Sequence, residues 1–203
     1  MRTITLRLPA SINDVTLGQY IAFLSLRRQV MEDGRSGQQW TPRRYARHVL
    51  SVFSGVDATT LGDIDDDQFQ DAFARINFLG ELDRLRPQGE WTGGTFEVKG
   101  ESFSLPDALD SATAGQYEVL EKTLRNTTVF EALDYLLAIL TMWDTPNILA
   151  HEAELQRRAT LFADELTMTR VIDMAFFLPG GRQKRYGKGI LSCLLRLQMM
   201  MGR

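Results

Sequence analysis

The N-terminal residues alternate between apolar and polar side chains. Ile4, Leu6 and Leu8 occupy every second position, and Pro9 follows them. A period of two is typical of a strand that is buried on one face, and proline cannot donate a hydrogen bond to a sheet. The pattern therefore predicts a strand over residues 3–8.

The chain contains the same sixteen-residue pattern twice. Residues 5–20 read TLRLPASINDVTLGQY, and residues 102–117 read SFSLPDALDSATAGQY. One shift of 97 positions aligns six identical pairs: Leu8/Leu105, Pro9/Pro106, Thr16/Thr113, Gly18/Gly115, Gln19/Gln116 and Tyr20/Tyr117. Because the shift is about half the chain, it predicts two related modules, each with its own strand entry and helix start.

Both copies contain the spacing of a capping box. In this motif a threonine at the helix N-cap and a glutamine three positions later bond each other's backbone amides. Thr16 with Gln19, and Thr113 with Gln116, fit this spacing. We therefore expect a helix to begin after each threonine.

The two repeated glycines lie within the first turns of these predicted helices. Gly18 and Gly115 lower the helix propensity there. A glycine is useful at such a place when another segment passes close to the backbone. We expect such a close approach at both glycines.

Further helix starts are indicated by other polar residues. Threonine before proline is a favoured helix entry, and an acidic or threonine cap followed three residues later by glutamine or glutamate has the spacing of a capping box. These signals occur at Thr41-Pro42, Asp65 with Gln68, Thr128 with Glu131, and Thr145-Pro146. At the start of the predicted second module, residues 95–99 and 101–105 alternate around Gly100, which predicts a hairpin.

These patterns together predict an α+β fold that is mostly helical. It consists of two tandem related modules, each opening with a strand or hairpin followed by a helical bundle, plus a C-terminal helix. The boundaries predicted from the glycine and proline positions are 1–89 for the first module, 90–180 for the second, and 181–203 for a basic glycine-containing hinge and the last helix.

Composition adds few constraints on function. The chain has 203 residues, 44% of them hydrophobic, with 26 acidic and 23 basic side chains. This balance gives no general attraction to nucleic acid or to an anionic membrane. The single cysteine, Cys193, excludes an internal disulfide framework, and the N-terminus lacks the apolar core of a signal peptide. We therefore expect a reducing, cytoplasmic protein with no membrane span.

No motif predicts catalysis. The acidic residues Asp63, Asp65, Asp66, Asp67 and Asp71 do not fit a calcium loop counted from Asp63, because Gln68 and Ala74 stand where glycine and glutamate are needed. Such carboxylates are favoured at a helix N-terminus. The glycines from 181 to 189 miss the spacing and the hydroxyl of a phosphate-binding loop. We expect neither an enzyme nor a metal nor a cofactor.

The C-terminal segment is basic and apolar and has no counterpart in the first half. Its candidate partner-binding residues are Arg182, Lys184, Arg185, Lys188, Leu191, Leu194, Leu195, Met199 and Met200. Three interpretations of the basic residues stay open: solvated charge beside a helix, docking onto an acidic protein surface, and contact with nucleic acid. Tyr186 is the one aromatic residue among them, which makes nucleic acid the least favoured partner.

The segment ITLRLPASINDVTLGQYIAFLSL, the later HVLSVFSGV and a second GQY helix ending in FFLPG resemble small morphogenesis proteins of tailed bacteriophages. The resemblance implies a tail assembly chaperone or a minor virion component, without enzymatic activity or cofactor. It assigns no role to any numbered residue.

We therefore expect a protein-binding factor in phage assembly, whose partner is a structural protein of the tail or of the head-tail junction. A homo-oligomer stays open. The expected location is the host cytoplasm during assembly, with retention in the virion as an alternative. The alternatives for function are a structural virion component, such as a connector, ring or internal protein, and a nucleic-acid-binding module.

Overall fold

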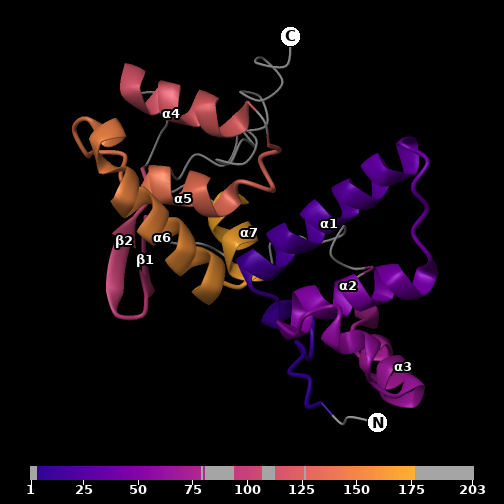
Figure 1. Cartoon of the computed structure of the whole chain (residues 1–203). Helices are drawn as coiled ribbons and strands as arrows, with labels where there is room; N and C mark the ends of the chain where they lie inside the picture. Colours follow the sequence, from indigo (N-terminus) through magenta and orange to yellow (C-terminus); the bar gives the residue numbers. More distant parts are fainter. Residues whose placement is uncertain (1–3, 79, 81–93, 107–112, 126, 177–203) are drawn as a thin grey trace. The chain divides into compact units, whose positions relative to one another are not determined.

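A computed structural model of the whole chain describes residues 4–78, 80, 94–106, 113–125 and 127–176 (Figure 1). The chain divides into two compact units. The first comprises Met1–Val15 and Gln19–Leu85, and the second comprises Thr16–Gly18 and Arg86–Arg203. The described residues are mostly helical and include one small sheet, which agrees with the predicted α+β class.

The first unit contains most of α1 (Leu17–Arg35), with α2 (Pro42–Ser54) and α3 (Asp66–Ala74). As predicted, α2 begins at Pro42: the Thr41 hydroxyl accepts a hydrogen bond from the Arg44 amide, and Gly55 ends the helix in a left-handed conformation at φ 71°. The core of this unit is formed by buried side chains of all three helices and of the segments between them: Phe23, Leu26, Val49, Leu50, Phe53, Leu61, Phe69 and Ile76.

The predicted N-terminal strand is wrong over its described residues. Residues 4–9 form no strand, although Ile4, Leu6 and Leu8 are less exposed than Thr5 and Arg7. The alternation therefore reflects an extended backbone with one half-buried face. The Ile4 carbonyl accepts a hydrogen bond from the Gln68 side chain, in place of a ladder bond from a neighbouring strand.

In the described part of its C-terminal segment, from residue 94 to residue 176, the second unit contains a hairpin and four α-helices. The hairpin consists of β1 (Thr95–Val98) and β2 (Glu101–Ser104), and the helices are α4 (Ala114–Leu124), α5 (Leu133–Thr141), α6 (Glu152–Glu165) and α7 (Met168–Phe176). Phe96 pairs with Phe103, and both rings pack against Phe162 of α6. Most of α5 is buried, including Leu136 through Leu140. Figure 1 shows the hairpin beside α5 and α6.

The hairpin turn follows from its two loop residues. Lys99 and Gly100 both have positive φ, at 49° and 80°. Two consecutive positive φ values characterise the type I′ turn, whose twist matches that of the strands it joins. The predicted hairpin is confirmed, with Val98 opposite Glu101 as the pair that closes it.

Two predicted helix starts are displaced. Thr128 and Glu131 form the reciprocal bonds of a capping box, but the regular helix α5 begins only at Leu133. Helix α6 begins at Glu152 and not at Pro146, because Asn147 takes a left-handed conformation at φ 51° that a right-handed helix cannot include. The predicted third segment, residues 181–203, lies outside the described residues.

Candidate functional surfaces

All nine predicted partner-binding residues lie beyond residue 176, outside the described part of the chain. They are Arg182, Lys184, Arg185, Lys188, Leu191, Leu194, Leu195, Met199 and Met200. Cys193 lies there too. This surface stays a prediction.

The repeated motif starts a helix at the same place in both copies. Helix α1 begins directly after Thr16, and α4 begins directly after Thr113. At α4 the predicted capping box is confirmed: Gln116 Oε1 accepts from the Thr113 amide at 2.6 Å, and Thr113 Oγ1 accepts from the Gln116 amide at 3.4 Å. The first copy adds a bond of its own, from the Leu17 amide to the Leu166 carbonyl at 2.7 Å.

The repeated glutamine makes the same kind of long-range bond in both units. Gln19 Nε2 donates to the Phe53 carbonyl, in the last turn of α2, at 3.0 Å. Gln116 Nε2 donates to the Trp143 carbonyl, just after α5. Carbonyls at helix C-termini lack partners within their own helix. Each glutamine therefore connects the start of one helix to the end of a later one, a bond that sequence spacing alone does not predict.

The other repeated residues differ between the copies. A Cβ at Gly18 would lie 3.0 Å from the Ala163 carbonyl oxygen, whereas a Cβ at Gly115 would meet no described atom within 4 Å. The expected close approach is thus confirmed at Gly18 and wrong at Gly115. Tyr20 is 7% exposed and Tyr117 is 48% exposed. The two copies therefore share the place where the helix begins and the long-range bond of the glutamine, while the glycine and the tyrosine differ in their surroundings.

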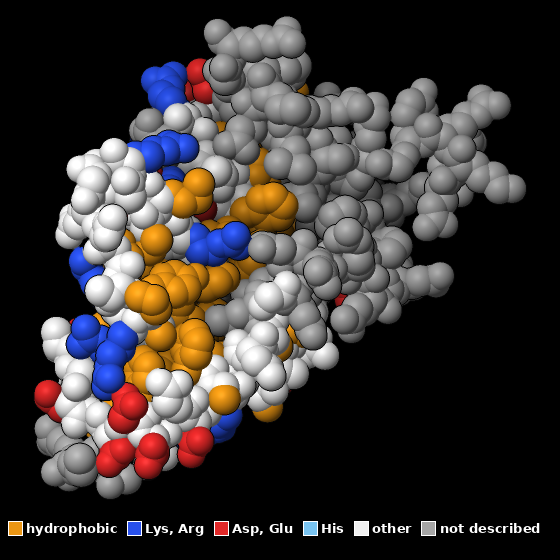
Figure 2. Space-filling view, turned by 90° about the vertical axis from the view of Figure 1, so that its right-hand side faces the viewer, with side chains coloured by type: hydrophobic (Ala, Val, Ile, Leu, Met, Phe, Trp, Pro, Cys, Tyr) orange, Lys and Arg blue, Asp and Glu red, His pale blue; other side chains and the backbone are white. Residues whose placement is uncertain are grey.

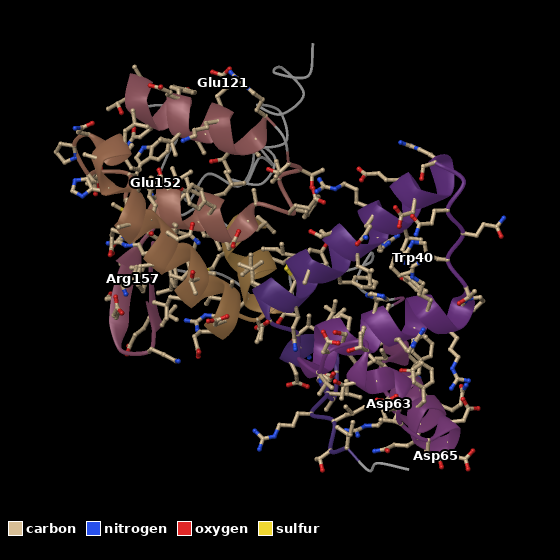
Figure 3. The ribbon with its side chains drawn as sticks, viewed as in Figure 1. Trp40, Asp63, Asp65, Glu121, Glu152 and Arg157 are labelled. Atoms are coloured by element: carbon tan, nitrogen blue, oxygen red, sulfur yellow. The ribbon has the colours of Figure 1, made fainter. Side chains whose placement is uncertain are left out.

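The acidic cluster serves a helix start. The Asp65 side chain accepts from the Asp67 amide at the beginning of α3, and Asp66 pairs with Arg43 at 2.8 Å. Figure 3 labels Asp63 and Asp65 at this end of α3. Across the described ranges, no group of three or more histidine, cysteine or acidic residues is arranged to hold a metal ion.

A polar network of two arginines and two glutamates lies on the hairpin side of α6. Arg157 binds both carboxylate oxygens of Glu101 in β2, at 2.9 and 2.7 Å, and also contacts Glu154 at 2.8 Å. Arg158 contacts Glu154 at 2.7 Å, donates to the Thr141 carbonyl, and lies 5.3 Å from the Phe103 ring centre. The label of Arg157 in Figure 3 marks this side of the helix. The network fixes the hairpin onto α6.

The arginines of this network lower the pKa values of its two carboxylates. Hydrogen bonds from Arg157 and then Arg158 lower the pKa of Glu154 to about 2. The hydrogen bond from Arg157 likewise lowers the pKa of Glu101. Both carboxylates are therefore charged at neutral pH, as acceptors and not as proton donors.

A second polar and aromatic cluster surrounds Trp40 in the first unit (Figure 3). Its indole nitrogen donates to Asp33 at 2.8 Å, and the Arg44 guanidinium lies 4.2 Å from the ring centre. The His48 ring meets Trp40 edge-on at 4.9 Å. Burial, followed by the charges of Arg44 and Arg47, lowers the pKa of His48. This histidine is accordingly neutral at pH 7 and packs as an aromatic ring.

Apolar side chains also reach the surface of the first unit. Figure 2 shows them gathered on the face toward the viewer, with acidic side chains along the lower edge.

In the parts of the chain that are described, the large apolar side chains with the greatest exposure are Met31 at 62%, Tyr117 at 48% and Leu149 at 41%. Among the described helices, none has the length and apolar character that crossing a membrane requires.

Comparison with known proteins found no matching family model, no matching curated protein and no matching solved structure.

Proposed function

We propose that this chain is a non-enzymatic protein-binding factor in the assembly of bacteriophage particles, similar to a tail assembly chaperone. The proposal rests on the resemblance of three segments, ITLRLPASINDVTLGQYIAFLSL, HVLSVFSGV and FFLPG, to morphogenesis proteins of tailed phages. It includes the origin of the two modules by duplication of one ancestral half.

The observation that carries the proposal is how the repeated motif is used. Gln19 and Gln116 both bond a carbonyl near the end of a later helix, and Thr113 caps α4. The most specific polar groups of the repeat therefore hold helices together and are not arranged around a ligand. This supports reading the repeat as a folding signal, with the specific function placed elsewhere in the chain.

The C-terminal segment is the natural place for that function, because the first half has no counterpart to it. Its leucines and methionines, from Leu191 to Met201, form an apolar stripe at helical spacing. Methionine side chains are flexible and adapt to irregular apolar surfaces. We propose that this stripe covers an aggregation-prone apolar surface of a phage structural subunit.

Removal of residues 188–203 tests the contact. The truncated chain should lose co-purification with the structural subunit from phage-infected cells, while its circular dichroism spectrum keeps the helical content of the two units. If the truncated chain unfolds, the segment belongs to the core and the proposed contact is wrong.

A charge-matched pair of variants tests the basic residues separately. Lys184→Gln with Arg185→Gln should weaken co-purification. Lys122→Gln with Arg125→Gln, which removes equal charge from exposed positions at the end of α4 and directly after it, should not. Equal weakening by both pairs would show a general charge effect and contradict a local docking site.

Mass spectrometry of purified virions distinguishes a chaperone from a virion component. A chaperone acts on a subunit before or during assembly and is then released. The chain should therefore be absent from purified particles. Its presence in a fixed copy number would replace the chaperone proposal with a structural role.

A further inference from the structure

One edge of the hairpin has backbone groups for which the described residues supply no partner. The Leu105 amide donates to the Gly94 carbonyl at 2.6 Å, so these two residues form a hydrogen-bonded pair. Such pairs alternate along an antiparallel ladder. Phe96 opposite Phe103 is therefore also a hydrogen-bonded pair, and the intervening Ser102 and Ser104 direct their N–H and C=O groups away from β1.

The two edges of the hairpin differ. On the β1 edge, the outward carbonyl of Glu97 accepts a hydrogen bond from Arg170 of α7 at 3.1 Å. On the β2 edge, Ser102 and Ser104 are exposed, and within the described structure no partner is found for their outward backbone groups. The β2 edge is thus the open one.

Within β2 itself, no side-chain block or bulge protects this edge against pairing. Exposed edge strands are commonly blocked by lysine, proline, a bulge or an inward-pointing charge. The segment from Glu101 to Ser104 contains no lysine, proline or bulge. Its single charge, Glu101, is bound through both carboxylate oxygens by Arg157. What remains along the edge is a pair of small hydroxyl side chains.

We propose that the open edge of β2 pairs antiparallel with β2 of a second copy of this chain, with Phe103 on the two-fold axis. In this register Ser102 lies opposite Ser104 of the second copy, and each such pair exchanges two hydrogen bonds. All outward backbone groups of both strands are then used. Two hairpins become one four-stranded sheet, which is more stable than an isolated two-stranded one.

The side chains of β2 fit this occupant on both faces. Phe103 lies opposite Phe103 of the second copy; its ring is 4% exposed and packs against Phe162 of its own chain, so the backbone of the two strands carries the pairing at this position. The serines lie opposite each other on the other face. Glu101 lies opposite Leu105 of the second copy, so no two like charges are directly opposed. Beyond them, Pro106 and the turn at Gly100 end the pairing on both sides.

Sedimentation velocity on the full chain tests the dimer, from about 1 μM to about 1 mM, a range that covers weak affinities. We expect a monomer-dimer equilibrium that depends on concentration. Ser102→Pro removes an outward N–H that the hairpin itself does not use, and it should weaken the association at least about tenfold by blocking the edge. A chain that stays monomeric throughout overturns the proposal.

Thr95→Pro is the matched control, because it removes an outward N–H from the opposite edge of the same hairpin. It should leave the association unchanged. If Thr95→Pro weakens the dimer as much as Ser102→Pro, or if Ser102→Pro has no effect, the dimer does not form through the β2 edge.

Disulfide trapping tests the register without proline. In a Cys193→Ser background, Ser102→Cys and Ser104→Cys chains should cross-link faster when mixed than either chain does alone, because positions 102 and 104 lie directly opposite in the dimer. Equal rates overturn the register, and a failure to cross-link overturns the pairing. These experiments use the chain alone, so they are independent of the proposed phage partner.

Discussion

Gln116 is the buried polar side chain in the described core, with an exposed fraction of 1%. Its amide group bonds the Thr113 amide on one side and the Trp143 carbonyl on the other. One side chain thus forms hydrogen bonds with the backbone amide at the start of α4 and with a backbone carbonyl just beyond the end of α5. A buried backbone group without such a partner costs free energy comparable to a lost hydrogen bond.

Gln116→Leu should lower the free energy of unfolding by about 2 kcal/mol, because it leaves two backbone groups unpaired. Urea unfolding followed by tryptophan fluorescence measures the loss. Gln19→Leu is the natural comparison, since Gln19 is only half-buried, and it should cost about 1 kcal/mol or less. Equal losses would contradict the difference in burial.

Substitution by alanine should change the stability of the chain in opposite directions at the two repeated glycines. Gly115→Ala should stabilise the chain by about 0.5–1 kcal/mol, because alanine favours a helix and finds open space. Gly18→Ala should destabilise it by about 1 kcal/mol, because the new methyl group crowds the Ala163 backbone. Thermal unfolding of both variants checks the signs, and a gain at Gly18 would show that α6 moves away at little cost.

At the scale of elements, some helix starts follow from purely local sequence signals. Thr41-Pro42 and Thr113 mark the starts of α2 and α4, because a cap needs only residues within one turn. Thr145-Pro146 failed because Asn147 turns the chain left-handed before α6 can begin. The strand over residues 3–8 failed because a strand needs a partner, which a single segment cannot supply.

The contacts around the hairpin could not be predicted in the same way. Glu101 and Arg157 are separated by 56 positions, and nothing in either local sequence indicates the other. The spacing of Gln116 predicts its capping box, but its bond to Trp143 depends on how α4 packs beside α5. Contacts of this kind, between residues far apart in the sequence, follow from the packing of the elements. The spacing of apolar residues along the chain contains no information about them.

The Glu154 network predicts a loss of stability in acid. The folded pKa of about 2 lies below the ordinary value of 4.5, so the stabilisation is complete above about pH 4.5 and is lost as the pH falls toward 2. Because the side chain is about a third exposed, solvent screening reduces the effect to about 1 kcal/mol.

Urea unfolding between pH 5 and pH 2 measures this effect. Glu154→Gln should be less stable than the parent chain at pH 5 and should approach it at pH 2. Glu118→Gln, at an exposed position of α4, serves as the control and should follow the parent chain throughout. A constant difference between Glu154→Gln and the parent chain would contradict the pKa argument.

At the scale of the whole molecule, the division into units does not follow the order of the sequence. Thr16–Gly18 belongs to the second unit, although the rest of that unit begins at Arg86. Thr16 forms a bridge with Thr167, and Leu17 is fully buried with its amide bonded to Leu166. Three N-terminal residues thereby complete a unit built mostly from the second half.

Leu17→Ala should therefore weaken the second unit, by about 2–4 kcal/mol for a fully buried leucine. Hydrogen exchange should speed up for the amides of α6, with those of α2 less affected. Leu50→Ala, at an equally buried position of the first unit, should show the reverse pattern. If both variants accelerate exchange equally in α2 and α6, the units unfold together.

The bond between Leu17 and Leu166 also bears on synthesis at the ribosome. This bond cannot form until nearly all of the described chain has emerged, because Leu17 and Leu166 lie 149 positions apart in the sequence. Until then Leu17 has no cover, and this hydrophobic residue is open to chaperones or to neighbouring nascent chains. The start of α1 is encoded by residues close together in the sequence, and yet Leu17 becomes buried only late in synthesis.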